Sequence, residues 1–180
     1  MKRRHVLIAA GAALVAPAAW LGLRGLPPAR AGEAEPKAEA AGITPLRKSA
    51  EEWQALLSPA AYAVLFEEAT ERAGSSPLNN EHRPGTYCCA ACYLPLFDAS
   101  HKYESGSGWP SFFTHLPGVM GTKRDWKLIY PRTEYHCIRC GGHQGHVFDD
   151  GPAPTGQRWC NNGLALRFVP QGEPLPELRT

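Results

Sequence analysis

The feature that most constrains this chain is a pair of Cys-x-x-Cys motifs, Cys89–Cys92 and Cys137–Cys140, with 44 residues between them. Each motif can place two thiolates on one metal ion from a tight turn, and two such turns complete a tetrahedral four-cysteine zinc site. Such a closed site is structural, and folding depends on its metal. The spacing favours zinc over two alternatives, which are disulfides among the six cysteines and an iron–sulfur centre.

Two further cysteines, Cys88 and Cys160, stand outside these motifs. Cys160 follows Arg158, whose positive charge favours the thiolate, the reactive form of cysteine. Upstream, His143 and His146 are available to move protons. These residues are candidates for a Cys/His catalytic site. The alternatives are surface or structural histidines, and a second metal site for which no further ligand is evident.

The body of the chain combines helical segments with many short strands. Ser49 and Glu52 fit a capping box, and Ser58-Pro59 fits the start of a second helix. After residue 74, β-like segments alternate with Gly and Pro turns. These segments span residues 85–89, 126–130, 133–137 and 164–169. We therefore expect a mainly β, antiparallel protein with N-terminal helices.

Residues 1–31 are typical of a targeting segment. Lys2, Arg3 and Arg4 precede an apolar stretch, and residues 29–31 fit a signal-peptidase site. The Arg3-Arg4 pair resembles a twin-arginine export signal. The alternative is an uncleaved membrane anchor over residues 6–23. Either interpretation predicts a periplasmic or otherwise exported protein, with membrane contact only if the segment is uncleaved.

The rest of the chain divides by composition and charge. Residues 32–44 have linker composition, so we expect a domain over residues 45–172 and a C-terminal tail over 173–180. The net charge is +2, but residues 1–31 hold five basic residues and no acidic one, which leaves a mildly acidic body. No basic run suits phosphate contacts, so nucleic-acid binding is disfavoured.

Several blocks of the body resemble the B-type methionine sulfoxide reductases, in the order of that family. They are the first cysteine motif within residues 85–97, a Trp-Pro-Ser-Phe loop within 105–112, Arg132-Thr-Glu, the second cysteine motif, residues 143–152, and Arg158-Trp-Cys-Asn-Asn. The resemblance covers residues 47–170. It implies two antiparallel sheets in a β-tent-like fold, with structural zinc at one edge and no organic cofactor. It also implies reduction of methionine-R-sulfoxide in oxidised proteins.

The resemblance assigns roles to individual residues. Cys160 matches the nucleophile, which becomes a sulfenic acid as methionine leaves. His143 and His146 match the residues around the sulfoxide oxygen, with His146 as the main proton donor. The other matches are Asn162 as a helper, Arg158 as the charge that favours the thiolate, and Trp109 and Phe148 as substrate-binding residues. The expected enzyme is a monomeric repair oxidoreductase that acts under oxidative stress.

Three positions depart from the usual pattern of the family. Ser107 stands where many members have a resolving cysteine, so we expect an external, thioredoxin-like thiol to reduce the sulfenic acid. Cys88, the one spare thiol in the chain, is the alternative resolving residue. Asn161 and Gly163 replace an apolar residue and a serine, which puts the geometry of the loop in question. Trp159 replaces Tyr or Phe, which removes a hydroxyl.

Two other functions stay open at this point. A non-catalytic zinc-ribbon module would explain the cysteine motifs but not Cys160, the histidine pair or the Trp-Pro-Ser-Phe loop. A degenerate reductase with little activity would explain Ser107 and Asn161.

Overall fold

The computed structural model describes residues 42–127 and 129–180. The predicted signal peptide or anchor at residues 1–31 and nearly all of the predicted linker lie outside the described residues. In the described part of the chain, no helix has the length and hydropathy that a membrane span requires.

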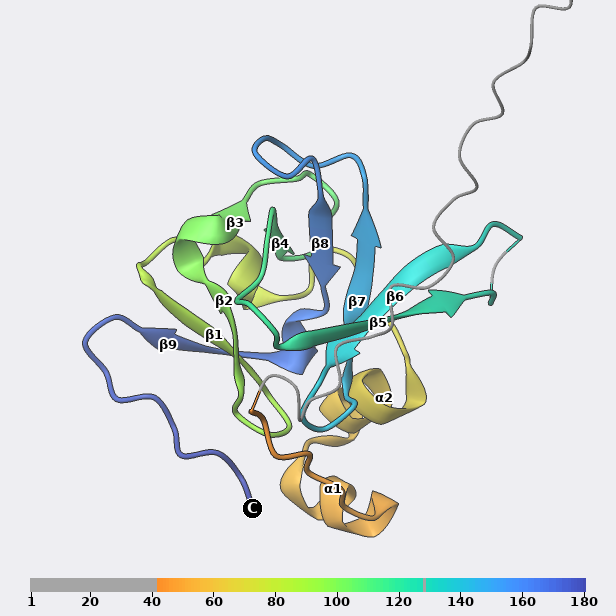
Figure 1. Cartoon of the computed structure of the whole chain (residues 1–180), viewed down its shortest axis with the longest axis vertical. Helices are drawn as coiled ribbons and strands as arrows, with labels where there is room; N and C mark the ends of the chain where they lie inside the picture. The colour runs from red at the N-terminus through yellow and green to blue at the C-terminus, as the bar shows by residue number, and fades with distance from the viewer. Residues whose placement is uncertain (1–41, 128) are drawn as a thin grey trace, which may run out of the picture. The chain divides into compact units, whose positions relative to one another are not determined.

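Two antiparallel sheets form the body of the fold (Figure 1). One has three strands in the order β2-β1-β9, and the other has six in the order β3-β4-β8-β7-β6-β5. The strands are β1 Gly85–Cys89, β2 Pro95–Asp98, β3 Lys102–Tyr103, β4 Ser111–Phe112, β5 Met120–Asp125, β6 Arg132–Cys137, β7 His143–Phe148, β8 Arg158–Asn161 and β9 Leu166–Pro170. The expected mainly β fold with two antiparallel sheets is therefore confirmed.

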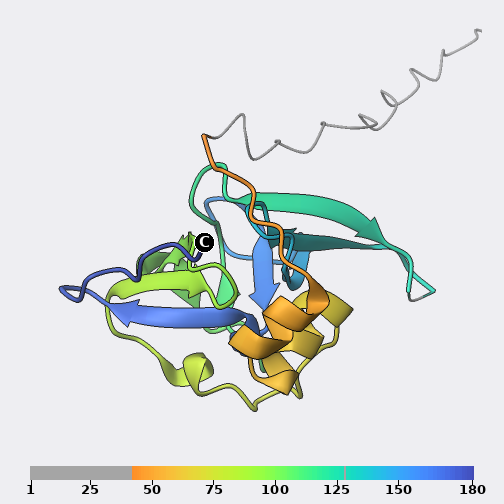
Figure 2. The same cartoon turned by 90° about the horizontal axis from the view of Figure 1, so that it is seen from below.

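Two helices precede the sheets and begin where the capping residues predict. In α1 (Ala50–Leu56), the Ser49 hydroxyl accepts from the Glu52 N–H and the Glu52 carboxylate accepts from the Ser49 N–H, which completes a capping box. In α2 (Pro59–Glu67), the Ser58 hydroxyl accepts from the Ala61 N–H. The two helices lie beside each other (Figure 2), and α2 packs against β7.

The residues that the structure describes also form three short 3-10 helices: η2 Pro77–Asn80, η3 Ala99–His101 and η4 Gly163–Ala165. The last lies between β8 and β9, where the chain passes from one sheet to the other. The predicted strand over residues 164–169 therefore begins two residues late, at Leu166, because residues 163–165 form this turn instead.

An aromatic core joins the two sheets. Phe97 of β2 stacks on Phe112 of β4, with ring centroids 4.0 Å apart, and Tyr87 of β1 meets the edge of Phe112 at 5.0 Å. Tyr135 of β6 contacts Phe97 at 6.4 Å. All four side chains are fully buried. Truncation of such a ring costs about 3–5 kcal/mol, so these contacts fix the sheets against each other.

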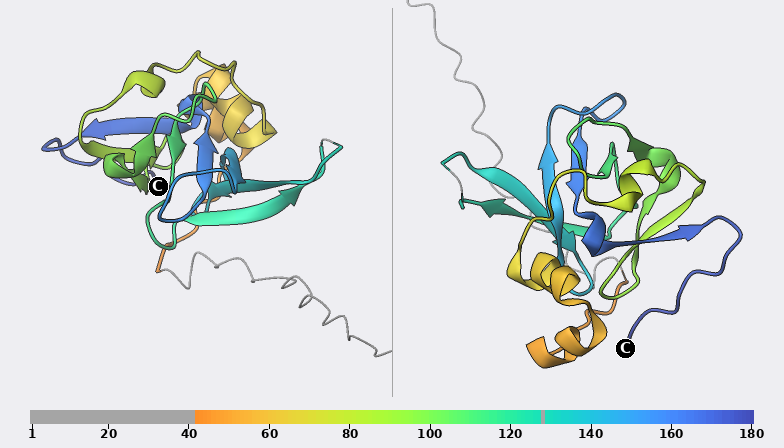
Figure 3. Two further views of the ribbon diagram at one scale, coloured as in Figure 1. Left: turned by 90° about the horizontal axis from the view of Figure 1, so that it is seen from above. Right: turned by 180° about the vertical axis from the view of Figure 1, so that it is seen from behind.

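The predicted strand over residues 126–130 is wrong, because β5 ends at Asp125 and β6 begins only at Arg132. The β5–β6 hairpin extends beyond the rest of its sheet in both views of Figure 3, and the described residues between its strands, 126–127 and 129–131, belong to neither strand. Its composition is typical of a strand. However, Trp126, Ile129 and Tyr130 are 71%, 95% and 80% exposed, so no packing surface holds them in a sheet.

Candidate functional site

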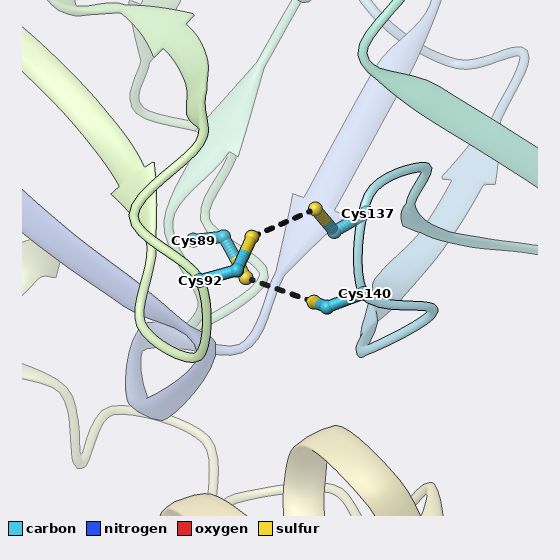
Figure 4. Close-up of side chains that lie close together, drawn as sticks. All are labelled: Cys89, Cys92, Cys137 and Cys140. Carbon is cyan, nitrogen blue, oxygen red and sulfur yellow. Dashed lines mark hydrogen bonds between the residues drawn. The ribbon is translucent and has the colours of Figure 1, made fainter. Parts of the chain in front are cut away.

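The four motif cysteines gather in one cluster (Figure 4). The Sγ atoms of Cys89 and Cys140 are 3.7 Å apart, those of Cys92 and Cys137 are 3.5 Å apart, and all four lie within 4.8 Å of one another. Thiolates bound tetrahedrally at about 2.3 Å from a zinc ion lie about 3.8 Å from each other. The four residues therefore fit a single metal ion held by sulfur.

The two cysteine turns share one backbone geometry. Tyr93 and Gly141, which each follow the second cysteine of a motif, have φ of 65° and 73°. The Tyr93 N–H donates to the Cys89 carbonyl at 2.9 Å, and the Gly141 N–H donates to the Cys137 carbonyl at 2.8 Å. All six cysteines are free, so the disulfide alternative is absent from the described residues.

Cys160 lies in a row of polar side chains that crosses the six-stranded sheet. It pairs with Ser111 of β4 on one side and with His146 of β7 on the other. His146 pairs with Glu134 of β6, and Glu134 pairs with Lys123 of β5. Directly paired residues of antiparallel strands point to the same face, so the sheet register brings these groups together.

Gly145 permits this register. A Cβ atom at Gly145 would lie 1.9 Å from the Cys160 carbonyl oxygen, so only glycine lets β7 approach β8 here. The next residue of β8 toward its start, Trp159, points to the opposite face and packs against Tyr135 with ring centroids 4.9 Å apart. On β8, the Cys160 thiol therefore lies on one face of the sheet, and the Trp159 ring packs into the core on the other face.

His146 is held by a carboxylate that the sequence analysis did not identify. Its Nε2 lies 2.7 Å from Oδ2 of Asp125, which also accepts from Arg132 Nη2 at 2.6 Å. The Lys127 backbone N–H, followed by His146 and Arg132, holds the pKa of Asp125 well below its usual range. Asp125 is therefore ionised, and Nε2 of His146 donates to it. Burial lowers the pKa of His146, against the opposing effect of Asp125.

His143 lies beside His146 and has its own buried carboxylate. The two imidazole rings are 5.5 Å apart, and Nδ1 of His143 lies 2.7 Å from Oε1 of Glu134. Burial raises the pKa of Glu134, but the nearby imidazoles of His136 and His143 outweigh it and set the pKa at about 2. Glu134 is thus ionised, so Nδ1 of His143 is the donor. The Arg132-Thr-Glu block contained this residue, but no pattern indicated its role.

A pocket of about 100 Å³ opens beside Cys160. It is lined by Thr70, Trp109, Arg132, Gly145, His146, Phe148, Cys160, Asn161 and Asn162. Five of these are predicted site residues, whereas Thr70 and Arg132 were not predicted to line the pocket. Its volume suits the end of one side chain.

Asn162 ties the segment after Cys160 to two neighbours. Its Nδ2 donates to the Gln144 carbonyl at 3.1 Å, and its Oδ1 accepts from the Glu71 N–H at 3.1 Å. The Glu71 carbonyl in turn accepts from Nε1 of Trp109 at 3.1 Å. Both amide atoms of Asn162 are therefore engaged by the protein, and Glu71 links this asparagine to the indole across the pocket.

The departures at Asn161, Gly163 and Trp159 are accommodated by their surroundings. Asn161 is fully buried, and its Oδ1 accepts from the Tyr135 hydroxyl at 2.8 Å. A Cβ atom at Gly163 would lie 1.9 Å from the Ser76 hydroxyl, so a larger residue would clash. Trp159 Nε1 donates to the Gln157 side chain at 3.1 Å. The loop is therefore fully hydrogen-bonded at these positions.

Arg158 lies two residues before Cys160 on β8, on the same face. Its guanidinium donates to both carboxylate oxygens of Asp150 at 2.8 Å and stacks 4.3 Å from the centroid of Phe148. Phe148 and Arg158 thus form one edge of the site, and Asp150 fixes the orientation of the charge.

Ser107 and Cys88 differ sharply in their relation to Cys160. The Ser107 hydroxyl lies 3.8 Å from the Cys160 sulfur and 2.8 Å from the Ser105 hydroxyl. Cys88 lies on β1 of the other sheet and is fully buried. Burial raises the pKa of the Cys88 thiol to about 11, which disfavours the reactive thiolate.

Comparisons with known proteins agree with these features. A family model described as the SelR domain matches residues 57–170. A peptide methionine sulfoxide reductase MsrB from Leptospira interrogans is 47% identical over 124 residues, covering 68% of this chain and 95% of the relative. An MsrB from Bradyrhizobium diazoefficiens is 49% identical over 127 residues, covering 69% and 90%. The chloroplastic peptide methionine sulfoxide reductase B1 of Arabidopsis thaliana is 45% identical over 121 residues, covering 67% and 60%.

Proposed function

The chain belongs to the SelR-domain family of MsrB methionine sulfoxide reductases, and on that premise we propose that it reduces methionine-R-sulfoxide in proteins through a Cys160 sulfenic acid. It is an enzyme of the peptide methionine sulfoxide reductase type. The observation that carries the proposal is the direct cross-strand pairing of Cys160 with His146 at a pocket walled by Trp109. A thiol, a proton donor and an apolar wall are the three groups that the reaction requires.

In the proposed reaction, the Cys160 thiolate attacks the sulfur of the sulfoxide while the imidazolium of His146 gives its proton to the oxygen. The oxygen passes to the cysteine sulfur as a hydroxyl group, and the thioether of methionine leaves. The cysteine sulfur gives up the two electrons that reduce the sulfoxide. The products are therefore methionine and Cys160 sulfenic acid.

The chain's own contacts support these roles. Asp125 engages Nε2 of His146, which leaves Nδ1 as the nitrogen that exchanges the proton with substrate. The indole of Trp109 is fixed through Glu71 and packs against the methyl group. With the methyl and the oxygen both held, the pocket accepts one epimer.

An external thioredoxin-like thiol then reduces the sulfenic acid. The neighbouring Ser107 has no thiol to contribute. Cys88 is fully buried on the other sheet, which argues against the alternative in which it resolves the intermediate.

The metal of the four-cysteine cluster is zinc, and its role is structural. Four sulfur ligands fill a tetrahedral ion and leave no position for substrate. We keep the exported location as part of the proposal, with residues 1–31 as a signal segment, 32–44 as a linker and 45–172 as the catalytic domain. That part rests on the sequence patterns alone.

An epimer-resolved assay on the zinc-loaded protein tests the proposal. With excess dithiothreitol, the R epimer should be reduced and the S epimer should not. Cys160→Ser should abolish turnover, and Ser107→Ala should retain it, because Ser107 is not the reductant. No turnover by the zinc-loaded protein would favour a degenerate reductase.

Mass spectrometry after one turnover without reductant tests the intermediate. A sulfenic acid on Cys160, trapped as its dimedone adduct, is the expected product. A disulfide between Cys88 and Cys160 would instead show that the chain resolves its own intermediate.

A further inference from the structure

The tip of the β5–β6 hairpin is the most exposed apolar surface among the described residues. Trp126, Ile129 and Tyr130, which we call the hairpin tip, are 71%, 95% and 80% exposed. The other exposed large apolar side chains in the described ranges are all leucines, between 37% and 48% exposed. A cluster of this kind on a soluble protein marks a binding surface more often than a chance exposure.

The hairpin that carries this tip is held in place by ion pairs. Lys123 and Lys127 each place Nζ 2.5 Å from the carboxylate of Glu68, which caps the C-terminal end of α2. At the base of the tip, Arg132 pairs with Asp125 at 2.6 Å. These ion pairs link the strands of the hairpin to the end of α2 and to each other.

The base of the hairpin belongs to the site around Cys160. Asp125 bonds to His146, and Arg132 lines the pocket. The tip follows directly in the chain, because Trp126 comes after Asp125 and Tyr130 lies two residues before Arg132. Figure 1 shows the two strands leading from the sheet out to this tip. The tip therefore lies, in the chain, between two residues of the site, Asp125 and Arg132.

We propose that the hairpin tip binds the polypeptide that flanks the oxidised methionine, and that it favours apolar flanking residues. This inference rests on the proposed function. When the sulfoxide end of a methionine side chain enters the pocket beside Cys160, the residues on either side of that methionine lie on the surrounding surface. Methionine in a protein core has apolar neighbours, and these become available when the oxidised protein unfolds.

The chemistry of the tip suits such a segment. Trp126 and Tyr130 offer large apolar areas with a polar group at one end, which is the composition of protein-binding surfaces. The two lysines beside the tip face two carboxylates: Glu68 pairs with both Lys123 and Lys127, and Glu134 lies 3.6 Å from Lys123. A lipid surface and a second copy of this chain are other occupants, and the experiment distinguishes them.

The test compares three substrates in the full chain. They are N-acetyl-methionine-R-sulfoxide, a peptide with the sulfoxide between leucine and phenylalanine residues, and a matched peptide with serine and glycine flanks. The variant is the triple change Trp126→Ser, Ile129→Ser and Tyr130→Ser. A matched control is Leu56→Ser, an exposed leucine on α1.

The triple variant should lose about tenfold in kcat/KM on the apolar peptide, mainly through KM, because burial of even part of the three side chains is lost. Its kcat/KM on N-acetyl-methionine-R-sulfoxide should change by less than about twofold. The polar peptide should be affected little, and the control variant should match the wild type on all three substrates.

Three results would overturn the inference. An equal loss on all substrates would mean that the tip only positions Asp125. No loss on the apolar peptide would mean that the peptide does not reach the tip. Self-association or vesicle binding by the wild type, lost in the triple variant while peptide kinetics are unchanged, would assign another occupant. Absence of wild-type turnover on every substrate would instead refute the proposed function.

Discussion

Two effects act on the pKa of the His146 imidazole in opposite directions. Burial lowers its pKa, while the hydrogen bond to the ionised Asp125 raises it. The charged, proton-donating form is therefore populated below the ordinary histidine value of about 6.5. Because the reaction also needs the Cys160 thiolate, which is lost as the pH falls, the single-turnover rate of sulfenic acid formation should be bell-shaped in pH, and His146 should set one limb of the profile.

Asp125→Asn should move this limb to lower pH. The change removes a negative charge that favours the imidazolium, so less of the proton donor is present at neutral pH and the rate should fall about tenfold or more. Single-turnover rates measured between about pH 5 and 8 on N-acetyl-methionine-R-sulfoxide report the limb directly. A limb that stays in place or moves to higher pH would contradict the assignment of His146 as the donor.

The sequence indicated the reacting residues but not the carboxylates that hold them. Cys160 and His146 lie in recognisable blocks, whereas Asp125 lies 21 residues from His146 and meets it only through the pairing of β5, β6 and β7. That pairing depends on register, and a shift of one residue would turn these side chains to the other face. No local pattern contains that information.

Glu134→Gln should destabilise the domain by about 2 kcal/mol at neutral pH. The change removes a buried charge that accepts from His143 at 2.7 Å and lies 3.6 Å from Lys123. Urea denaturation of the zinc-loaded protein measures the loss. Glu67→Gln, an exposed change on α2, serves as the control and should have no measurable effect.

Among the elements, the segment between α2 and η2 holds residues of the site in place through hydrogen bonds. The carboxylate of Glu71 accepts from the backbone N–H groups of Gly163 at 2.6 Å and Leu164 at 3.1 Å. The backbone of the same residue contacts Trp109 and Asn162. One residue thus fixes the start of η4 and both sides of the pocket.

Glu71→Ala should cost about 2–3 kcal/mol of stability, because two buried N–H groups lose their acceptor. Glu71→Gln keeps one acceptor oxygen and should cost about half as much. Urea unfolding midpoints of the two variants give the comparison. Equal costs would mean that the charge of the carboxylate, which both variants remove, decides the stability rather than its hydrogen bonds or its shape.

Elements with local signals were predicted well, and those without were not. Ser49 and Ser58 cap their helices as expected, because a cap depends on only three or four residues. The strand expected at residues 126–130 failed, because its aromatic composition mimics a buried strand. What the pattern could not reveal is that Trp126 and Tyr130 stay 71% and 80% exposed.

At the scale of the whole molecule, the cysteine cluster joins the two sheets. Cys89 ends β1 of the smaller sheet and Cys137 ends β6 of the larger one. The Gln144 side chain donates to the Cys89 sulfur at 3.5 Å, and the Gln144 carbonyl accepts from the Asn162 N–H at 2.8 Å. The metal site is therefore connected to the segment after Cys160.

Removal of the metal should consequently unfold most of the domain and abolish activity at the same time. Chelator titration followed by circular dichroism should show loss of β structure in parallel with loss of metal. Retention of the sheet signal in the metal-free protein would show that the aromatic core alone holds the sheets.

The C-terminal tail covers the first cysteine turn. The Arg179 N–H donates to the Cys92 carbonyl at 3.2 Å, and the Arg179 carbonyl accepts from Arg139 at 2.6 Å. The guanidinium of Arg179 bonds to the Tyr93 hydroxyl at 2.5 Å and stacks 4.4 Å from its ring. Tyr93 is the residue with positive φ that closes this turn, so the tail braces the strained position next to a metal ligand.

Arg179→Ala should therefore release zinc faster without changing the ligands. Opening of the turn must precede capture of the ion by a chelator, and the lost contacts make opening easier by about 1 kcal/mol, or roughly fivefold in rate. Zinc transfer to a colorimetric chelator gives the rate independently of activity. Arg83→Ala, which removes an exposed ion pair with Glu81 away from the cluster, should release zinc at the wild-type rate. Equal rates for the two variants would mean that the four thiolates and the aromatic core alone retain the metal.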